Sequence, residues 1–167
     1  MHEGAYKFIA RSARTLGFRQ AVIELGSRHV PGSWPYSGPV RPLFMARSYL
    51  GVDVREGPNV DVVANAAVWR PDEPVDTVIC AETLEHTEEA ADICHTAWEM
   101  LADDGAFIVT TAGVGRAEHS AVDGGPLRDG EFYRNVTKDD LRGWLSDFTK
   151  VIIDDTEPGD IYALALK

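Results

Sequence analysis

The chain has 167 residues, 44% of them hydrophobic, which fits one domain with a sizeable core and leaves no room for a second domain of ordinary size. With 27 acidic and 16 basic residues and a net charge of -11, it offers little positive charge to neutralise phosphates. Nucleic acids and anionic membranes are therefore not expected as partners. A local basic patch remains an alternative, because Arg11, Arg14 and Arg19 cluster near the start of the chain. We favour the simpler interpretation that these are ordinary solvated arginines.

The sequence predicts a cytoplasmic protein with reduced thiols. It contains no signal-peptide pattern and no window approaching the about 18 apolar residues of a membrane span. Cys80 and Cys94 are its two cysteines, and neither belongs to a CxxC pair or to a Cys/His spacing typical of zinc sites. We expect both thiols to be buried, and we expect no metal site.

The first half of the chain alternates between predicted helix and strand. An amphipathic helix fits residues 4–17, and Gly17 ends it, so residues 1–19 form a lead-in to the first strand. The elements that follow are a strand at 20–25, a loop rich in Gly, Pro and Ser at 26–42, a short helical segment at 43–47, and strands at 49–54 and 60–63.

The second half continues the alternation. Residues 75–81 form an uninterrupted apolar run, typical of a central strand buried on both faces. A helix is expected from a cap at Thr87 to a stop at Asp104-Gly105, followed by a strand at 106–111 and a long polar loop at 113–130. Then come a helix capped by Thr137 and two strands, 151–155 and 161–166, which a Pro-Gly turn joins.

This order predicts an α/β protein with one Rossmann-like, doubly wound sheet. The sheet should be mostly parallel, with an antiparallel strand at the C-terminus. Ligands of such sheets bind at the carboxyl edge, where the strand order reverses. Glu24 and Gly26 end the first strand, and Asp53 ends the second, so these residues should meet at that edge. Asp53 can accept hydrogen bonds from ribose hydroxyls, and Gly26 lets the backbone come close to a ligand.

Five segments then resemble successive motifs of the class I S-adenosyl-L-methionine (SAM)-dependent methyltransferases, especially those acting on small molecules. They are VIELGS, YLGVDV, DVVANA, VDTVICAETLEH and DDGAFIVTT, and the resemblance is close over residues 20–112. It implies a methyltransferase domain over residues 1–167, SAM as cofactor and a small-molecule acceptor. It also implies cofactor contacts: Glu24 and Gly26 at the methionine and ribose side, Asp53 at the ribose hydroxyls, Asn65 and Ala66 at the adenine, and Ala81 and Glu82 at the end of the fourth strand.

The glycine loop departs from the family pattern. The family has ExGxGxG, whereas two of its three glycines are missing after Glu24; we expect the Gly26-Ser27 and Gly32-Ser33 pairs to share the task. The segment SWPYSGP then lengthens the path to Asp53. Asn65 stands where the family usually has an aspartate, which should soften adenine binding without abolishing it.

Catalysis by positioning needs no nucleophile, because methyl transfer is an in-line displacement in a dry pocket. His119 is the candidate base for a hydroxyl or acidic-carbon acceptor, since an imidazole titrates near neutral pH; a solvent-exposed loop histidine is the alternative. For His86 we favour structural hydrogen bonding over catalysis. Residues 113–130 are expected to form a mobile lid, with a passive surface loop as the alternative.

Two other functions stay in view. The depleted glycine loop suits a SAM- or nucleotide-binding module without catalysis. An NAD-binding protein fits less well, because the terminal strand pair is antiparallel and Arg28 and Pro31 stand where the dinucleotide fingerprint needs glycines. The sequence leaves a homodimer open.

Overall fold

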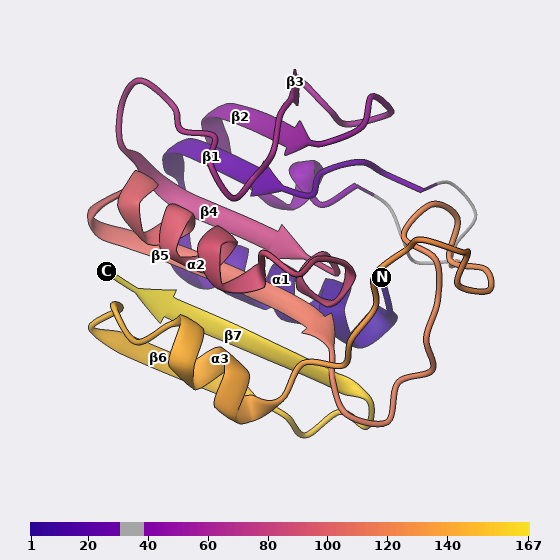
Figure 1. Cartoon of the computed structure of the whole chain (residues 1–167). Helices are drawn as coiled ribbons and strands as arrows, with labels where there is room; N and C mark the ends of the chain where they lie inside the picture. The colour runs from indigo at the N-terminus through magenta and orange to yellow at the C-terminus, as the bar shows by residue number, and fades with distance from the viewer. Residues whose placement is uncertain (31–38) are drawn as a thin grey trace.

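One mixed seven-stranded sheet organises the described part of the chain, as the sequence predicts. The computed structural model describes residues 1–30 and 39–167 (Figure 1). The strand order is β3-β2-β1-β4-β5-β7-β6, and β7 runs antiparallel to both of its neighbours while the remaining pairs are parallel. The strands are β1 (Arg19–Leu25), β2 (Ala46–Asp53), β3 (Val62–Val63), β4 (Val75–Ala81), β5 (Leu101–Ala112), β6 (Lys150–Asp154) and β7 (Asp160–Leu166).

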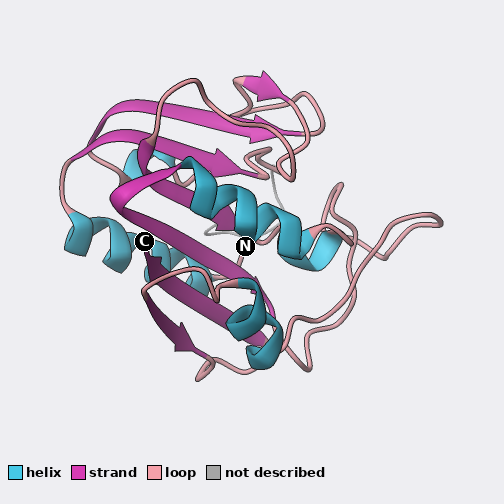
Figure 2. Ribbon diagram, turned by 60° about the vertical axis from the view of Figure 1, so that its left-hand side comes forward, coloured by secondary structure: helices cyan, strands magenta, loops and turns pink. Residues whose placement is uncertain are grey.

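Helices cover both faces of the sheet, which makes it doubly wound (Figure 2). Helix α1 (Glu3–Leu16) lies on one face, and α2 (Ala90–Met100) and α3 (Lys138–Trp144) lie on the other (Figure 1). Two 3₁₀ turns, η1 (Arg41–Leu43) and η2 (Leu84–His86), complete the elements. Among the described residues, no helix combines the length and the apolar character needed to cross a bilayer.

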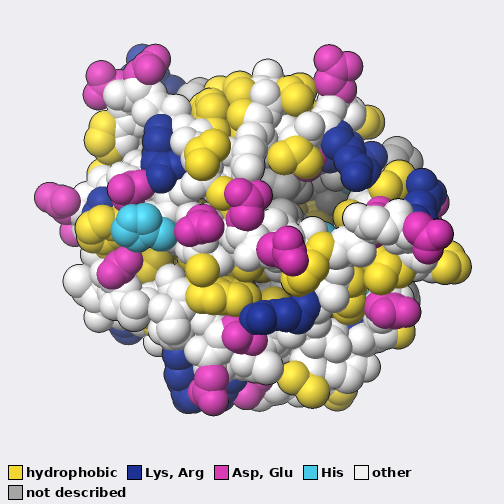
Figure 3. All heavy atoms as spheres, in the orientation of Figure 1, with side chains coloured by type: hydrophobic (Ala, Val, Ile, Leu, Met, Phe, Trp, Pro, Cys, Tyr) yellow, Lys and Arg dark blue, Asp and Glu magenta, His cyan; other side chains and the backbone are white. Residues whose placement is uncertain are grey.

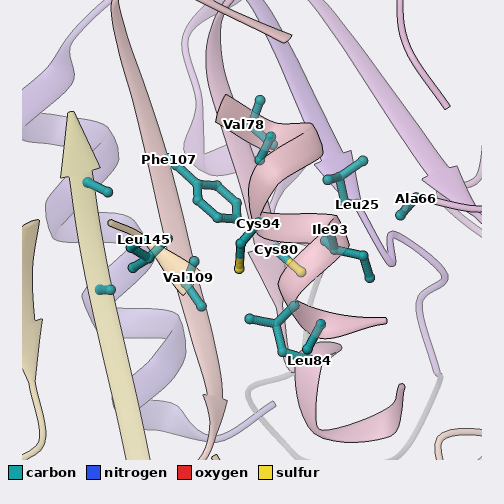
Figure 4. Packing of buried hydrophobic residues seen from close by; sticks show 14 of the residues in the cluster. Leu25, Ala66, Val78, Cys80, Leu84, Ile93, Cys94, Phe107, Val109 and Leu145 are labelled. Atoms are coloured by element: carbon teal, nitrogen blue, oxygen red, sulfur yellow. The ribbon is translucent and has the colours of Figure 1, made fainter. Parts of the chain in front are cut away.

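Strand β4 lies between two separate cores, which explains its uninterrupted apolar sequence. Because side chains alternate along a strand, Val78 and Cys80 pack on the α2 and α3 side, whereas Ile79 packs on the α1 side. Figure 4 shows Cys80 and Cys94 among the apolar side chains of the first core. Both cysteines are free and buried, as predicted.

Helix α2 is shorter than predicted at both ends. The hydroxyl of Thr87 accepts a hydrogen bond from the backbone N–H of Glu89, so it caps a local turn, and the helix begins only at Ala90. At the other end Leu101 pairs with Val75 in the sheet and is buried, so β5 begins before the predicted stop at Asp104-Gly105. Tertiary pairing therefore overrides the helical periodicity.

The short helix predicted at residues 43–47 is wrong. The segment instead holds the end of η1 and the start of β2, because Ala46 already pairs with Arg19 of β1. The capping box of α3 is confirmed: the Thr137 hydroxyl accepts from the Asp140 N–H, and the Asp140 carboxylate accepts from the Thr137 N–H. The helix ends at Trp144, earlier than the apolar spacing suggests.

Candidate functional site

A cavity of about 430 Å³ lies at the carboxyl ends of β1, β2 and β4. The strand order reverses between β1 and β4, which is where open α/β sheets bind ligands. The cavity is lined by all nine residues that the sequence assigned to the site: Glu24, Gly26, Ser27, Asp53, Asn65, Ala66, Ala81, Glu82 and His119. Residues far apart in the chain thus meet at one place, but a shared location does not by itself assign their roles.

Glu24 is a buried carboxylate at the end of β1. The Tyr49 hydroxyl and the Asn59 side-chain amide both donate to its Oε2, each at 2.7 Å. Burial raises the pKa of Glu24 to about 7, although these two hydrogen bonds oppose the shift. Asn59 has a φ of 72° and also donates to the Ser27 carbonyl, so this left-handed residue holds the loop after β1 against Glu24.

Gly26 and Ser27 form a close turn over the sheet edge. Gly26 has a φ of 72°, and a Cβ there would lie 2.0 Å from Oγ1 of Thr83, so this position requires glycine. The N–H groups of Gly26 and Ser27 both donate to the Val52 carbonyl. The Ser27 hydroxyl is buried and has no hydrogen-bond partner within the described residues.

Asp53 lies half-buried at the end of β2. Its Oδ2 accepts the Arg28 N–H and its Oδ1 accepts the Arg55 N–H, both at 3.0 Å. A carboxylate has about four acceptor positions, so each oxygen keeps capacity for a further donor. These backbone contacts orient Asp53 without saturating it.

Asn65 and Ala66 line the wall of the cavity that follows β3. The Asn65 amide donates to both carboxylate oxygens of Glu89, and its Oδ1 accepts the N–H of Ala67. The side chain of Asn65 is therefore engaged with its own turn and with Glu89. Ala66 is buried and presents a small apolar surface.

Glu82 follows Ala81 at the end of β4 in a conformation that costs energy. Its φ is 51°, and its Oε1 is buried without a hydrogen-bond partner within residues 1–30 and 39–167. Burial, together with the nearby charge of Glu85, raises the pKa of Glu82 to about 7. A left-handed backbone at a non-glycine residue and an unpaired buried carboxylate often mark a functional site.

Three rings, those of His86, His119 and Tyr133, pack together beside the cavity, which both histidines line. The centroids of His86 and His119 are 4.9 Å apart, and Tyr133 lies 5.4 Å from the first and 5.0 Å from the second. Burial lowers the pKa of His86 to about 4, so its imidazole is neutral near pH 7. The Nδ1 of His86 has no hydrogen-bond partner in the described part of the chain, which leaves the predicted structural hydrogen bond unsupported at that atom.

No protein-family model and no curated protein matches this chain. Solved structures match almost all of it. The complex of DhpI with S-adenosylhomocysteine (SAH) shares 18% identity at a TM-score of 0.66, over 97% of this chain and 83% of that one. N-methyltransferase NodS from Bradyrhizobium japonicum WM9, also with SAH, shares 12% at 0.66, over 98% and 86%. A Burkholderia thailandensis 1,6-didemethyltoxoflavin-N1-methyltransferase shares 15% at 0.65, over 99% and 79%.

The chain has the class I SAM-dependent methyltransferase fold. Within this fold, the loop after β5 lines the cavity with residues 119–121 and contacts the loop after β1. The Arg28 guanidinium donates to the carbonyl oxygens of Ala121 and Val122, each at 3.1 Å. Ser120 is buried, and its hydroxyl donates to Glu131. These contacts hold residues 113–130 near the site, and mobility of that loop stays a prediction.

Several residues of the methyltransferase-fold site escape prediction from the sequence. Tyr49 and Asn59 hold Glu24, Thr83 closes over Gly26, and Arg28 links two loops. The turn signal Gly57-Pro58-Asn59 was the one clue that the sequence offered. The Gly32-Ser33 pair, and the segment SWPYSGP except for its last residue, lie outside the described residues.

Charge on the visible surface is mixed. Figure 3 shows Asp and Glu side chains interspersed with Lys and Arg on the face that it presents. Oppositely charged side chains of the protein also form ion pairs, as Arg70 does with Glu99. On this face the methyltransferase fold presents no broad basic area of the kind that phosphate-backbone binding requires.

Proposed function

We propose that this protein binds SAM in the cavity at the carboxyl edge of the sheet and transfers its methyl group to a small-molecule acceptor. The observation that carries the proposal is the convergence of Glu24, Gly26 and Asp53 on one cavity at the switch point of a fold shared with SAH-bound proteins. SAM, when bound, supplies a methyl group activated by a sulfonium sulfur.

The residues present fit such a cofactor. Thr83 packs directly against Gly26 where a Cβ would lie, and Gly26 itself lines the cavity, so its backbone borders the space that a ligand would fill. The Ser27 hydroxyl is buried and unpaired within the described residues, so a polar ligand group would satisfy it. Asp53 retains acceptor capacity, and two ribose hydroxyls are suitable donors for it.

The remaining assigned residues take roles by position. Asn65 and Ala66 would line the adenine side, while Ala81 and Glu82 would flank the cofactor beside Glu24. His119 would serve the acceptor, where an imidazole can accept a proton from a hydroxyl or an acidic carbon. The B. thailandensis enzyme was solved with bound 1,6-didemethyltoxoflavin, which supports an acceptor of small-molecule size.

Ligand-induced stabilisation tests the cofactor assignment. SAM and SAH should raise the melting temperature, because a ligand at 100 times its Kd adds about 2.7 kcal/mol. NAD should not. The absence of a shift at millimolar SAM and SAH would contradict the proposal, and a shift with NAD alone would favour a dehydrogenase-type site.

Substitution of Asp53 tests the binding mode. Asp53→Ala should weaken SAH binding roughly ten- to a hundredfold, since it removes charge-assisted hydrogen bonds worth about 1.5 to 3 kcal/mol each. Asp139→Ala is the matched control, because that carboxylate is 90% exposed and pairs only locally with Arg142. Equal affinity in both variants would refute the role of Asp53.

A turnover assay distinguishes a methyltransferase from a protein that binds SAM without catalysis. The depleted glycine loop keeps a non-catalytic SAM-binding module in view. Conversion of SAM to SAH in the presence of a metabolite pool supports the methyltransferase. Tight SAH binding without turnover across a broad acceptor screen would favour the binding module instead.

A further inference from the structure

Two histidines and a carboxylate converge at the acceptor end of the cavity. Glu85, His86 and His119 each offer one ligand atom, and these atoms lie within 4.8 Å of one another. His86 and His119 both line the cavity, so this cluster borders open space. No Cys/His spacing announces it, because Glu85 and His86 are adjacent and His119 comes from a distant loop.

Glu85 is held in place as metal-ligating carboxylates commonly are. It is fully buried in η2, where its Oε2 accepts the Thr111 hydroxyl at 2.8 Å and its Oε1 accepts the Ala112 N–H at 3.2 Å. Each oxygen therefore has one donor and keeps capacity for another ligand. Such outer hydrogen bonds orient the first ligands of metal sites.

A second observation in the same cluster is compatible with a cation. Nδ1 of His86 is buried and has no hydrogen-bond partner within residues 1–30 and 39–167. Leaving a buried polar group unpaired costs about 1 to 3 kcal/mol. In the tautomer that carries its proton on Nε2, Nδ1 is an acceptor, and a bound cation would satisfy it.

We propose that Glu85, His86 and His119 bind a divalent transition-metal ion at the acceptor end of the cavity. Two imidazoles and one carboxylate suit Zn²⁺, Mn²⁺ or Fe²⁺ better than Mg²⁺, which prefers oxygen ligands only. Ligands about 2.1 Å from one ion are roughly 3.4 Å apart in a tetrahedron, so the cluster must contract slightly. His119 lies in a loop without regular structure and can make that adjustment.

The site narrows the class of acceptor, an extension that rests on the proposed function. Three protein ligands leave at least one coordination position, and it would face the cavity. An ion there would bind an oxygen of the acceptor and lower the pKa of a hydroxyl. The acceptor is then a hydroxyl-bearing molecule, and His119 acts through the ion because its ligating nitrogen cannot also accept a proton. The hydroxyl proton would pass to solvent, the oxygen would form a bond to the methyl carbon as the bond between that carbon and the sulfonium sulfur breaks, and SAH would leave.

Calorimetric titration of chelator-treated full-length protein with Zn²⁺, Mn²⁺ and Mg²⁺ tests the site directly. The wild type should bind one Zn²⁺ or Mn²⁺ more tightly than Mg²⁺. His119→Ala should weaken binding by more than the roughly ten- to hundredfold that follows from losing a hydrogen-bond partner of a ligand. His95→Ala is the matched control, since exposed His95 lies beside the carboxylates of Glu99 and Asp147 and would reveal non-specific binding to a surface histidine.

The outcomes are distinguishable from those of the SAM proposal. Absorption bands of Co²⁺ that appear in the wild type and in His95→Ala but are lost in His119→Ala would support the site without any turnover measurement. Unchanged metal affinity in His119→Ala, or loss only in His95→Ala, would overturn it. His119→Ala should retain the SAH affinity of the wild type when both are measured on the same samples. If no sample binds SAH, the cofactor assignment is refuted while the metal result still stands.

Discussion

Replacing Gly26 by alanine should destabilise the fold for two separable reasons. The φ of 72° places a side chain in the left-handed region, which costs about 1 to 2 kcal/mol. The added Cβ would also lie 2.0 Å from Oγ1, 2.6 Å from Cγ2 and 2.8 Å from Cβ of Thr83. Thr83 must then move and risk its hydrogen bond to the Ala81 carbonyl, so overpacking adds about 1 to 3 kcal/mol.

Gly130 provides the control that isolates the second effect. Its φ is also positive, 83°, but no atom lies within 4 Å of the position that an added Cβ would take, so Gly130→Ala incurs only the backbone cost. Denaturant unfolding of both variants should give Gly26→Ala the larger loss by about 1 to 3 kcal/mol. The pair Gly26→Ala and Thr83→Ala should recover part of this difference in a double-mutant cycle.

Equal losses in the two glycine variants would refute the close contact between Gly26 and Thr83. A full loss that Thr83→Ala does not relieve would place the conflict elsewhere in the turn. SAH affinity should fall in Gly26→Ala and stay unchanged in Gly130→Ala, because Gly26 lines the cavity and Gly130 does not.

Three further predictions concern stability and loop order. Burial raises the pKa of Glu24 from its ordinary 4.5 to about 7, so the stability that protonated Glu24 contributes is complete below pH 4.5 and is lost as pH rises through 7, by about 3 kcal/mol. Glu24→Gln should flatten the plot of unfolding free energy against pH over this range. An unchanged slope in this variant would contradict the prediction. Thr137→Ala should lower the free energy of unfolding by about 0.5 to 2 kcal/mol, because it removes the α3 cap. An unchanged melting temperature in thermal unfolding would contradict this prediction. Arg28→Met should speed amide hydrogen exchange in residues 119–125 but not in β4, since it removes two hydrogen bonds to that loop; unaltered protection there would show that the guanidinium does not hold it.

The elements that the sequence predicts well are those whose local pattern and tertiary environment agree. Residues 75–81 are apolar throughout because β4 packs on both faces. Thr137 and Asp140 are three residues apart, so their capping box needs no distant partner. Gly17 ends α1 with a positive φ that favours glycine.

The predictions that fail concern segments whose secondary structure is decided by pairing with a strand distant in the sequence. Leu101 continues a helical stripe in the sequence, yet its pairing with Val75 makes it the start of β5. The same holds at Ala46, which a helical pattern includes and which the register with Arg19 turns into strand. Local periodicity cannot report a partner that lies about 26 residues or more away.

The site separates in the same way into predictable and unpredictable parts. Strand ends are predictable, so Glu24 and Asp53 fall on the cavity as expected. The residues that orient them are not, because Asn59 reaches Glu24 only through a left-handed turn that follows β2. The approach of His119 to His86 likewise depends on the path of a loop without regular structure.

The carboxylates around the cavity differ in how many hydrogen bonds they receive from the protein, and therefore in the energetic cost of burying them. Glu24 receives two side-chain donors and Glu85 receives a hydroxyl and a backbone N–H, so protein groups offset part of the cost of burying both carboxylates. Oε1 of Glu82 has no such donor within the described residues, and its backbone is left-handed. An unpaired buried group costs about 1 to 3 kcal/mol and a left-handed non-glycine residue about as much again, which is a sizeable part of the about 5 to 15 kcal/mol that stabilises a typical domain. A fold can retain such a cost where function requires it, so under the proposed function we expect the chemistry near Glu82 at the end of β4 and ligand binding at the ends of β1 and β2.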